Sequence, residues 1–476
     1  MAVPDLEGAR VVVAGMGVSG RAAAEVLASR GARVVPVDDA AGDVLSTDEL
    51  LGGDVLDRTD LVVASPGLAP HHPLLRAATE RSVPVWSEVE LAWQVRVATT
   101  GGEPAPWLAV TGTNGKTTTV GMLESILRAA GRATAAVGNV GTPVVLAATD
   151  PTLDVLAVEL SSFQLHHTYA MSAQAAAVLN VAADHLDWHG TLDAYAAAKG
   201  RIYERAQVAC VYNAADPVTE HLVREADVVD GCVAVGFTTG TPGVGQVGLV
   251  EDVLVDRGFA RLRHTHAAEL GTLADLHRLA GPDGAVPPHV VADALAAGAL
   301  ALAHGVEPQA VRDGLRAYAP GAHRIAPVGV VDGVAYVDDS KATNAHAAAA
   351  SLASFAPGSV VWVAGGLAKG ATFDELVAGR RDRLRGVVLI GADREPLRDA
   401  LARHAPDVPV VEVEPGDTGA VMTLAVHEAR RLASGAPADA VTVLLAPACA
   451  SMDQFASYAE RGDRFAEAVR ALREEG

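Results

Sequence analysis

The segment Leu108–Val120, reading L-A-V-T-G-T-N-G-K-T-T-T-V, combines residue types that suit phosphate binding. An apolar run ends at Thr111, a turn bracketed by two glycines follows, and a helical pattern begins by Val120. Glycines let backbone N–H groups approach phosphate oxygens, and a helix start adds unpaired donors and the positive end of its dipole. The predicted phosphate loop comprises Gly112, Thr113, Asn114, Gly115, Lys116 and Thr117. Lys116 would reach the β- and γ-phosphates, and the Thr117 hydroxyl would ligate Mg²⁺.

The spacing of the two glycines differs from that of the usual phosphate loop, G-x-x-x-x-G-K-[ST]. Here Gly112 precedes Gly115 by only three residues. A tight turn between a strand and a helix is the plain alternative. The Lys-Thr pair directly after Gly115 has no structural necessity in such a turn, so the pattern favours phosphate binding.

Acidic and basic side chains follow two further apolar runs. Glu159 ends a strand predicted over 154–158, a position that often holds Mg²⁺ in phosphate-loop domains, although it could also face solvent. After a strand predicted over 176–181, Asp184, His185, Asp187 and His189 crowd one loop. This cluster could suit zinc, but no second half of a zinc site appears, so we interpret His185 as a neighbour of Mg²⁺ or phosphate.

Lys199 lies on a helix predicted over 192–205, with Tyr195 and Tyr203 on its flanks. Taken alone, it would be a solvated surface lysine.

A second glycine-rich turn, Gly15 to Gly20, follows a strand predicted over 10–14 and opens a helix. The next predicted strand, 33–37, ends in Asp38 and Asp39. Glycines at a strand–helix turn with an acidic residue about twenty positions later are typical of dinucleotide-binding domains. NAD is one candidate, but the same turn can hold any diphosphate.

The C-terminal third alternates apolar strands with amphipathic helices, which predicts a buried, doubly wound parallel sheet. Polar clusters follow three of these strands, at 338–341, 365–370 and 447–451. Because the carboxyl ends of parallel strands share one edge, these clusters predict a ligand-binding edge.

Composition limits the classes of function. The chain has 476 residues and a formal net charge of −21, which argues against a general binder of nucleic acid or anionic membrane. Its three cysteines have no metal spacing, which favours a reducing, cytoplasmic compartment. The N-terminus lacks the pattern of a signal peptide, and no apolar run is long enough to span a bilayer.

Two Gly/Pro stretches, 99–106 and 319–322, divide the sequence into three predicted domains, 1–98, 99–320 and 321–476. We predict an α/β protein. The N-terminal domain would be Rossmann-like, the central one a phosphate-loop ATPase-like parallel sheet, and the C-terminal one a doubly wound, Rossmann-like sheet. Residues 231–290 give no clear pattern.

Seven strings together resemble the Mur ligase family, the ATP-dependent amide-bond ligases of peptidoglycan precursor synthesis. The resemblance covers nearly the whole chain, and its details match the branch of the family that adds D-glutamate. The strings are G-T-N-G-K-T-T-T (112–119), E-L-S-S-F-Q-L (159–165), N-V-A-A-D-H-L-D (180–187), A-A-K-G-R-I-Y (197–203), A-H-R-I (322–325), D-D-S-K-A-T-N (338–344) and P-A-C-A-S-M-D-Q-F (447–455).

The resemblance implies a cytoplasmic ligase, expected as a monomer, that uses ATP and two Mg²⁺ ions. Its substrates would be UDP-N-acetylmuramoyl-L-alanine and D-glutamate, with neither nucleic acid nor membrane as partner. Lys199 matches a lysine that is carbamylated in the family, which would let it ligate a metal together with Thr117, Glu159 and His185. Lys116, His185 and Lys199 are the implied catalytic residues.

Binding roles carry over in the same way. For ATP they fall on the phosphate loop with Thr118, and on Asp293, Arg324, Asp339 and Lys341. For the UDP-sugar they fall on Ser19, Asp38, Asp39, Ser65, Asn139, Ser161, Gln164 and His185. For D-glutamate they fall on Thr343, Lys369, Ser451, Met452 and Tyr458.

One departure from the family pattern concerns adenine. The family usually has an H-N-x-x-N helix start whose second Asn pairs with adenine, whereas this chain has Val290 and Asp293. An ionised Asp accepts a hydrogen bond from the adenine amino group but cannot donate one. Three alternative functions remain open. The chain could be a sister ligase for another amino acid, or a non-catalytic nucleotide-binding relative, which the change at Asp293 motivates. The third alternative, an NAD oxidoreductase, would leave the phosphate loop unexplained.

Overall fold

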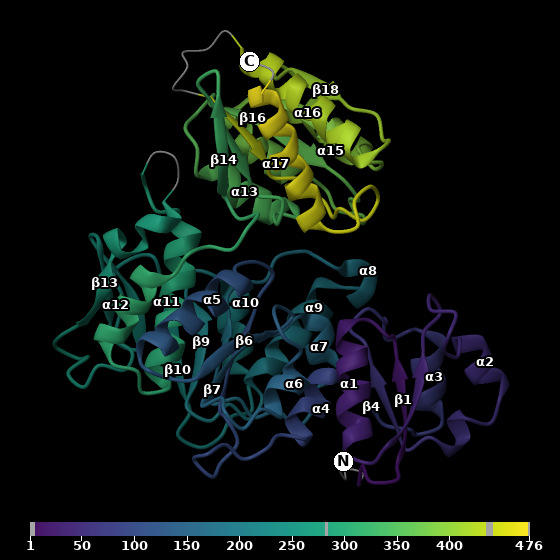
Figure 1. The fold of residues 1–476 in the computed structure, drawn as a ribbon. Coiled ribbons are helices and arrows are strands. Elements are labelled where there is room, and N and C mark those ends of the chain that lie inside the picture. Colours follow the sequence, from purple (N-terminus) through teal and green to yellow (C-terminus); the bar gives the residue numbers. More distant parts are fainter. Residues whose placement is uncertain (1–4, 281–283, 435–440, 475–476) are drawn as a thin grey trace. The chain divides into compact units, whose positions relative to one another are not determined.

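The computed structural model describes residues 5–280, 284–434 and 441–474. The start of the chain, where no signal peptide is expected, and its last two residues lie outside these ranges. The described chain forms two compact units, one of residues 5–275 and 290–318 and the other of the remainder. Two sheets belong to the first unit and one to the second (Figure 1).

The N-terminal sheet is small, parallel and covered on both faces. Its order is β2-β1-β3-β4. Val11 and Val13 of β1 pack toward α1 and α4, whereas Val12 packs toward α2 and α3, as the two-residue period of a strand requires. The elements are β1 Arg10–Ala14, α1 Val18–Ser29, β2 Arg33–Val37, α2 Thr47–Gly52, β3 Leu61–Ala64, α3 Pro73–Glu80, β4 Val85–Ser87 and α4 Glu88–Gln94.

The central sheet has the order β13-β12-β11-β10-β9-β8-β5-β7-β6. Its strands are β5 Trp107–Thr111, β6 Thr134–Gly138, β7 Val155–Glu159, β8 Ala175–Val178, β9 Ala209–Asn213, β10 Val233–Phe237, β11 Gln246–Val250, β12 Val253–Asp256 and β13 Ala268–Thr272. Its helices are α5 Lys116–Ala129, α6 Val144–Ala148, α7 Ser162–His166, α8 Leu186–His189, α9 Leu192–Gly200, α10 Pro217–Arg224, α11 Pro288–Ala303 and α12 Pro308–Ala317.

Strands β6 to β11 of the central sheet are parallel with β5, and β12 and β13 turn antiparallel at its far edge. The chain leaves β5 toward β6 on one side and later returns to β8 on the other side. Such a reversal opens a crevice at the carboxyl end of the strand. The sheet therefore presents the predicted phosphate loop at its natural ligand-binding position.

Buried carboxylates tie the N-terminal segment to the central sheet. Glu88, at the start of α4, accepts a hydrogen bond from the Val145 backbone at 2.6 Å, and burial raises the pKa of its carboxyl to about 7. Glu90 accepts from the backbone of Tyr169 and Ala170 at 2.7 and 2.9 Å. These contacts satisfy donors that would otherwise be buried without partners.

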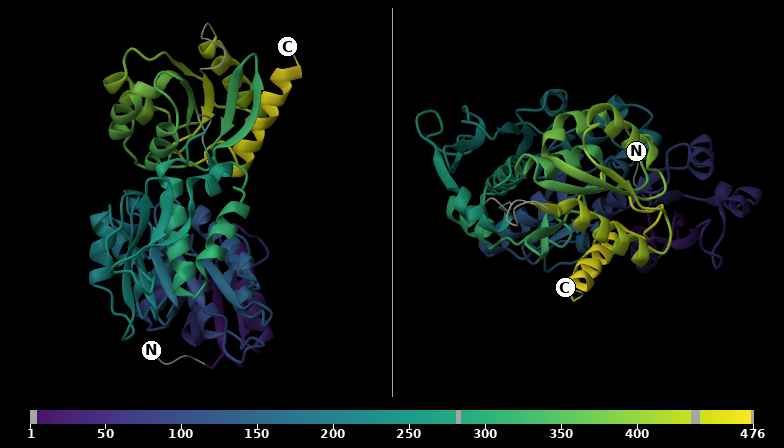
Figure 2. Two further views of the ribbon diagram at one scale, coloured as in Figure 1. Left: turned by 90° about the vertical axis from the view of Figure 1, so that its left-hand side faces the viewer. Right: turned by 90° about the horizontal axis from the view of Figure 1, so that it is seen from above.

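The second unit holds a six-stranded sheet of order β14-β15-β19-β16-β17-β18, in which only β14 is antiparallel to its neighbour. Helices α13, α14 and α15 cover one face, and α16 and α17 cover the other. Figure 2 shows α17, in yellow, beside β14. The elements are β14 Ala326–Val331, β15 Val334–Asp338, α13 Ala345–Ala353, β16 Val360–Gly365, α14 Asp374–Arg380, β17 Leu384–Ile390, α15 Glu395–His404, β18 Val410–Glu412, α16 Thr418–Ala433, β19 Thr442–Leu445 and α17 Tyr458–Glu474.

The predicted fold class is confirmed, and most strands fall within two residues of their predicted bounds. Three details differ. Helix α5 begins at Lys116, four residues before the predicted pattern, because Gly115 caps it. The helix predicted to Arg205 ends at Gly200. Eight strands had no counterpart in the prediction, because short strands carry little periodicity: the parallel strands β4, β6, β9, β10 and β11, and the strands β12, β13 and β14, whose pairings include antiparallel ones. The bounds of the three predicted domains stay predictions.

Gly314 provides a test of the packing between α12 and α5. A Cβ at this position would lie 2.3 Å from the Ile126 Cα, so the two backbones are too close for any side chain. We expect Gly314→Ala to lower the free energy of unfolding by about 2 kcal/mol, measured by thermal and urea denaturation. Gly379→Ala on α14, where a Cβ would meet nothing within 4 Å, is the matched control and should leave the unfolding midpoint unchanged or slightly higher.

Candidate active site

The phosphate loop is held from both neighbouring strands. On the β7 side, the Thr111 hydroxyl donates to the Leu160 carbonyl at 2.7 Å. On the β8 side, the Thr113 N–H donates to the Asn180 carbonyl at 3.0 Å, and the Asn114 N–H donates to the Asn180 side-chain oxygen at 2.9 Å. The loop conformation is therefore fixed by tertiary contacts as well as by its own glycines.

Gly115 ends the loop in the left-handed region, with φ of 83°, and caps α5. A Cβ there would lie 2.3 Å from Oδ1 of Asp293, on α11. Both the backbone conformation and the carboxylate thus require glycine at this position. The structure places Asp293, the residue that departs from the family pattern, against the end of the phosphate loop.

Two lysines converge on one backbone carbonyl. The Lys116 ammonium donates to Gly112 O at 2.8 Å and to Thr113 O at 2.9 Å, and the Lys199 ammonium donates to Gly112 O at 2.9 Å. Lys199 is 1% exposed and lies over the Tyr195 ring, so the interpretation of a solvated lysine is wrong. Burial, and then the Lys116 charge, hold the pKa of Lys199 well below its usual value.

Glu159 is a buried carboxylate with one oxygen unsatisfied. It is 1% exposed; Oε1 accepts from the Asn139 amide at 2.8 Å, and Oε2 has no partner in the described chain. A buried oxygen without a donor is costly unless a cation completes it. The described residues contain no group of three or more His, Cys, Asp or Glu that could hold a metal unaided. A single buried carboxylate beside a phosphate loop fits Mg²⁺, which usually takes one or two carboxylates together with phosphate and water.

His185 stands at the edge of the same crevice in a left-handed conformation, with φ of 54°. Its ring packs edge-on against Phe163, with centroids 4.7 Å apart, and its Nε2 lies 3.6 Å from an oxygen of Asp184. Nearby, Ser161 and Gln164 form a reciprocal cap at the start of α7, so the Gln164 side-chain oxygen is already engaged.

The residues of the N-terminal sheet predicted to bind the UDP-sugar lie at and near its glycine turn, and Asp38 holds that turn directly. Asp38 accepts the Met16 N–H at 2.6 Å, and this bond is the main cause of the lowered pKa of its carboxyl. Asp39 accepts from the backbone and hydroxyl of Thr47. Ser65 abuts the turn at Gly15, and Ser19 lies in the first turn of α1.

The three polar strand ends of the second unit lie together. Leu367 and Ala450 exchange backbone hydrogen bonds, and the Ala448 N–H donates to the Ala342 carbonyl at 2.9 Å. The expectation that they share one edge is confirmed. Of the predicted residues there, Lys341 donates to the Tyr458 hydroxyl at 3.1 Å and lies over its ring.

The other predicted residues of this unit have differing environments. Asp339 is buried, and this burial raises the pKa of its carboxyl to about 7. Lys369 takes a left-handed conformation, with φ of 49°. Ser451 is buried, whereas Met452 is 75% exposed. Arg324, on the loop before β14, and Thr343, before α13, complete the set.

Sequence reasoning missed two residues that organise these sites. Asn180 holds the phosphate loop; in the sequence it falls inside the strand predicted over 176–181 and at the start of the string at 180–187, and neither pattern gave it a role. Arg461, fully buried on α17, donates to Ser340 and to the Cys449 carbonyl, joining two of the strand ends. Its spacing in α17 resembled that of any surface arginine.

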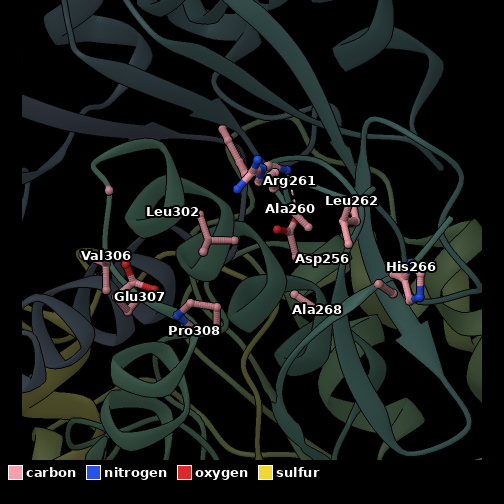
Figure 3. Close-up of a pocket in the computed structure, with 13 residues that line it drawn as sticks. Asp256, Ala260, Arg261, Leu262, His266, Ala268, Leu302, Val306, Glu307 and Pro308 are labelled. Atoms are coloured by element: carbon pink, nitrogen blue, oxygen red, sulfur yellow. Dashed lines mark hydrogen bonds between the residues drawn. The ribbon is translucent and has the colours of Figure 1, made fainter. Parts of the chain in front are cut away.

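A cavity of about 450 Å³ lies elsewhere in the first unit and shares no residue with the predicted sites (Figure 3). Side chains from the β12–β13 connection, such as Leu262, line it together with Leu302 and Val306 near the end of α11. It lacks the glycine loop and the buried carboxylate of the phosphate site, so we do not assign the chemistry to it.

The site combines a phosphate loop on a parallel sheet with the buried side chains of Lys199 and Glu159. This combination is typical of enzymes that bind a nucleoside triphosphate. A family profile described as the Mur ligase middle domain matches residues 110–243. The chain is 59% identical to a relative from Streptomyces coelicolor and 60% identical to one from Streptomyces avermitilis, over 98% of this chain and 99% of each relative. It belongs to the Mur ligase family. Both relatives are named UDP-N-acetylmuramoylalanine–D-glutamate ligase, as is one from Mycolicibacterium smegmatis that is 46% identical over 98% of both chains.

Solved structures share the fold at low sequence identity. UDP-N-acetylmuramate-alanine ligase MurC from Thermotoga maritima is 17% identical, with a TM-score of 0.56 over 97% of this chain and 99% of that one. MurF ligase from the same organism, in complex with ADP, is also 17% identical, with a TM-score of 0.55 over 99% and 100%. No helix in the described ranges is both long and apolar enough to cross a membrane.

The unsatisfied oxygen of Glu159 gives a direct test of the metal site. Glu159→Gln should retain the Asn139 contact but remove the negative charge that a cation needs. We expect a 10²- to 10³-fold loss in the rate of ATP-derived phosphate release and a higher Mg²⁺ requirement, measured by magnesium titration. Glu124→Gln on α5, which removes only an exposed pair with Arg128, is the control and should change neither quantity. A normal Mg²⁺ requirement in Glu159→Gln would contradict the assignment.

Proposed function

We propose that this chain is an ATP-dependent ligase that adds D-glutamate to UDP-N-acetylmuramoyl-L-alanine during peptidoglycan precursor synthesis. The observation that carries the proposal is identity of 59–60% to D-glutamate ligases over 98% of the chain, which includes all three sheets. The convergence of Lys116, Glu159 and Lys199 on the phosphate loop supports an active ATP site. A cytoplasmic location is part of the proposal.

The reaction begins with activation of a carboxylate. The alanine carboxylate of the UDP-sugar attacks the γ-phosphorus of ATP, and ADP leaves as an acyl phosphate forms. The backbone N–H groups of the loop and the Lys116 ammonium stabilise the charge on the transferring phosphoryl group, which is mainly a task of positioning and electrostatics. To contact phosphate, Lys116 exchanges one of its present carbonyl partners for a phosphate oxygen.

The second step forms the amide bond. The D-glutamate amine attacks the acyl carbon, and inorganic phosphate leaves. The amine must first lose a proton before it can attack. Lys369, Ser451 and Tyr458 supply the fixed cation and hydroxyl donors that a dicarboxylate needs. Water must be kept from the acyl phosphate throughout.

Thr117, Glu159 and His185 would hold Mg²⁺, with Lys199 if it is carbamylated. Bound there, Mg²⁺ supplies charge neutralisation for the phosphates of ATP. The buried amine of Lys199 suits carbamylation, because its lowered pKa favours the neutral form that combines with CO₂. The product is an anion beside the Lys116 ammonium, so the two side chains become an ion pair.

Carbamylation predicts a dependence on dissolved CO₂. Removing CO₂ and bicarbonate should lower the rate of phosphate release at least about tenfold, and bicarbonate should restore it. Carbon-13 NMR with labelled bicarbonate should show a carbamate resonance in the wild type and none in Lys199→Arg. Full activity without CO₂ and no carbamate resonance would rule the modification out.

Phosphate release from ATP with UDP-N-acetylmuramoyl-L-alanine tests the function itself. We expect release with D-glutamate, none with L-glutamate or without an amino acid, and a product heavier by one glutamyl residue. Release only with another amino acid would identify a sister ligase. ATP binding without release under any acceptor would favour the non-catalytic alternative, which the departure at Val290 and Asp293 motivates.

A further inference from the structure

Two of the three cysteines lie in contact in the central sheet, outside the residues assigned to the ligase reaction. Cys210 is on β9, and Cys232 directly precedes β10, the parallel neighbour of β9. Their Sγ atoms are 3.9 Å apart, and neither forms a disulfide in this structure. Nothing in the proposed reaction uses either thiol.

The geometry of the pair suits a cross-link. The sulfur atoms need to approach by only about 2 Å to reach disulfide bonding distance. Hydrogen bonds already hold the two chain segments together, with the Val233 N–H donating to the Val208 carbonyl at 3.0 Å. The register places Cys210 opposite Ala234, two residues beyond Cys232, so the two sulfur atoms meet diagonally across the neighbouring segments.

The two thiols differ in a way that separates their chemical roles. Cys210 is 2% exposed and packs in the core, whereas Cys232 is only partly buried. The two sulfur atoms share a hydrogen-bond contact in which either thiol can donate, and the contact with Cys210 lowers the pKa of Cys232. A partly exposed sulfur that is stabilised as the thiolate is the more reactive nucleophile, and its buried neighbour is placed to resolve the product.

We propose that Cys210 and Cys232 form a peroxide-oxidised modification site that closes to a reversible intramolecular disulfide. The Cys232 thiolate attacks one oxygen of hydrogen peroxide; the O–O bond breaks, hydroxide leaves, and a sulfenic acid forms. The Cys210 thiol then attacks that sulfur, forming the S–S bond and releasing water. The sulfur atoms together lose two electrons, which peroxide accepts. A dithiol reverses the reaction by exchange and is itself oxidised.

The position of the pair connects it with the sheet that carries the phosphate loop. Strand β9 lies beside β8, which in turn lies beside β5. Just beyond β9, Asp216 accepts the Val181 N–H at 2.9 Å, in the loop that follows β8. The disulfide would thus fasten the strand whose end supports that loop. The proposal concerns the thiols and does not depend on the identity of the amino-acid substrate.

Peptide mapping of the full-length protein tests this proposal directly. After mild hydrogen peroxide treatment and alkylation, we expect a linked peptide pair containing Cys210 and Cys232, which dithiothreitol converts back to two free thiols. Cys449 is the internal control, because burial raises the pKa of its thiol to about 12 and it has no thiol neighbour in the described chain. Cys232 should be oxidised at least about tenfold faster than Cys449.

Two variants separate the roles of the thiols. Cys210→Ser should leave a sulfenic acid on Cys232 that dimedone traps, whereas Cys232→Ser should leave Cys210 unmodified. The proposal is overturned if peroxide-treated wild type contains no linked peptides. It is also overturned if Cys449 is oxidised as fast as Cys232. The wild-type result decides the question even if a variant fails to fold.

Discussion

The central site depends on one constraint: two lysine ammonium groups share the Gly112 carbonyl in a buried setting. Two cations so close together repel each other, and burial removes the water that would screen them. The nearby carboxylates of Asp184 and Glu159 act in the opposite direction and favour the charged form of Lys199. The balance lowers the pKa of Lys199, so Lys116 remains the cation that would meet the phosphate groups of a nucleotide.

The phosphate loop beside these lysines is held in a rigid frame. The loop is fastened to the end of β7 through Leu160 and to the segment after β8 through Asn180, so the strands on either side of β5 determine its shape. Gly115 adopts the left-handed conformation at a position where the Asp293 carboxylate leaves no room for a side chain. A rigid cradle of this kind avoids the cost of reorganising donors when phosphate binds.

In the second unit, a buried arginine fixes the positions of the strand ends. The buried Arg461 guanidinium donates hydrogen bonds to Ser340 and to the Cys449 carbonyl, and these bonds join the ends of β15 and β19. Lys341 and Tyr458 are held together in the same region. In both units, buried cations position the strand ends that carry the candidate binding residues.

The sequence by itself determined the fold class, the place of the phosphate loop and the parallel strands that carry most of the predicted site residues, but it did not locate the parallel strands β4, β6, β9, β10 and β11. These features follow from local signals: apolar runs of strand length, glycines at turns and a Lys-Thr pair at a helix start. Only the tertiary structure decided that Lys199 is buried, that Asn180 braces the loop and that Cys210 touches Cys232. Each of these three contacts depends on which strands become neighbours in the sheet. The periodicity of a sequence indicates that one face of an element is buried, but it does not indicate which element packs against that face. The same reason explains why Arg461 resembled a surface residue until α17 was placed against the strand ends.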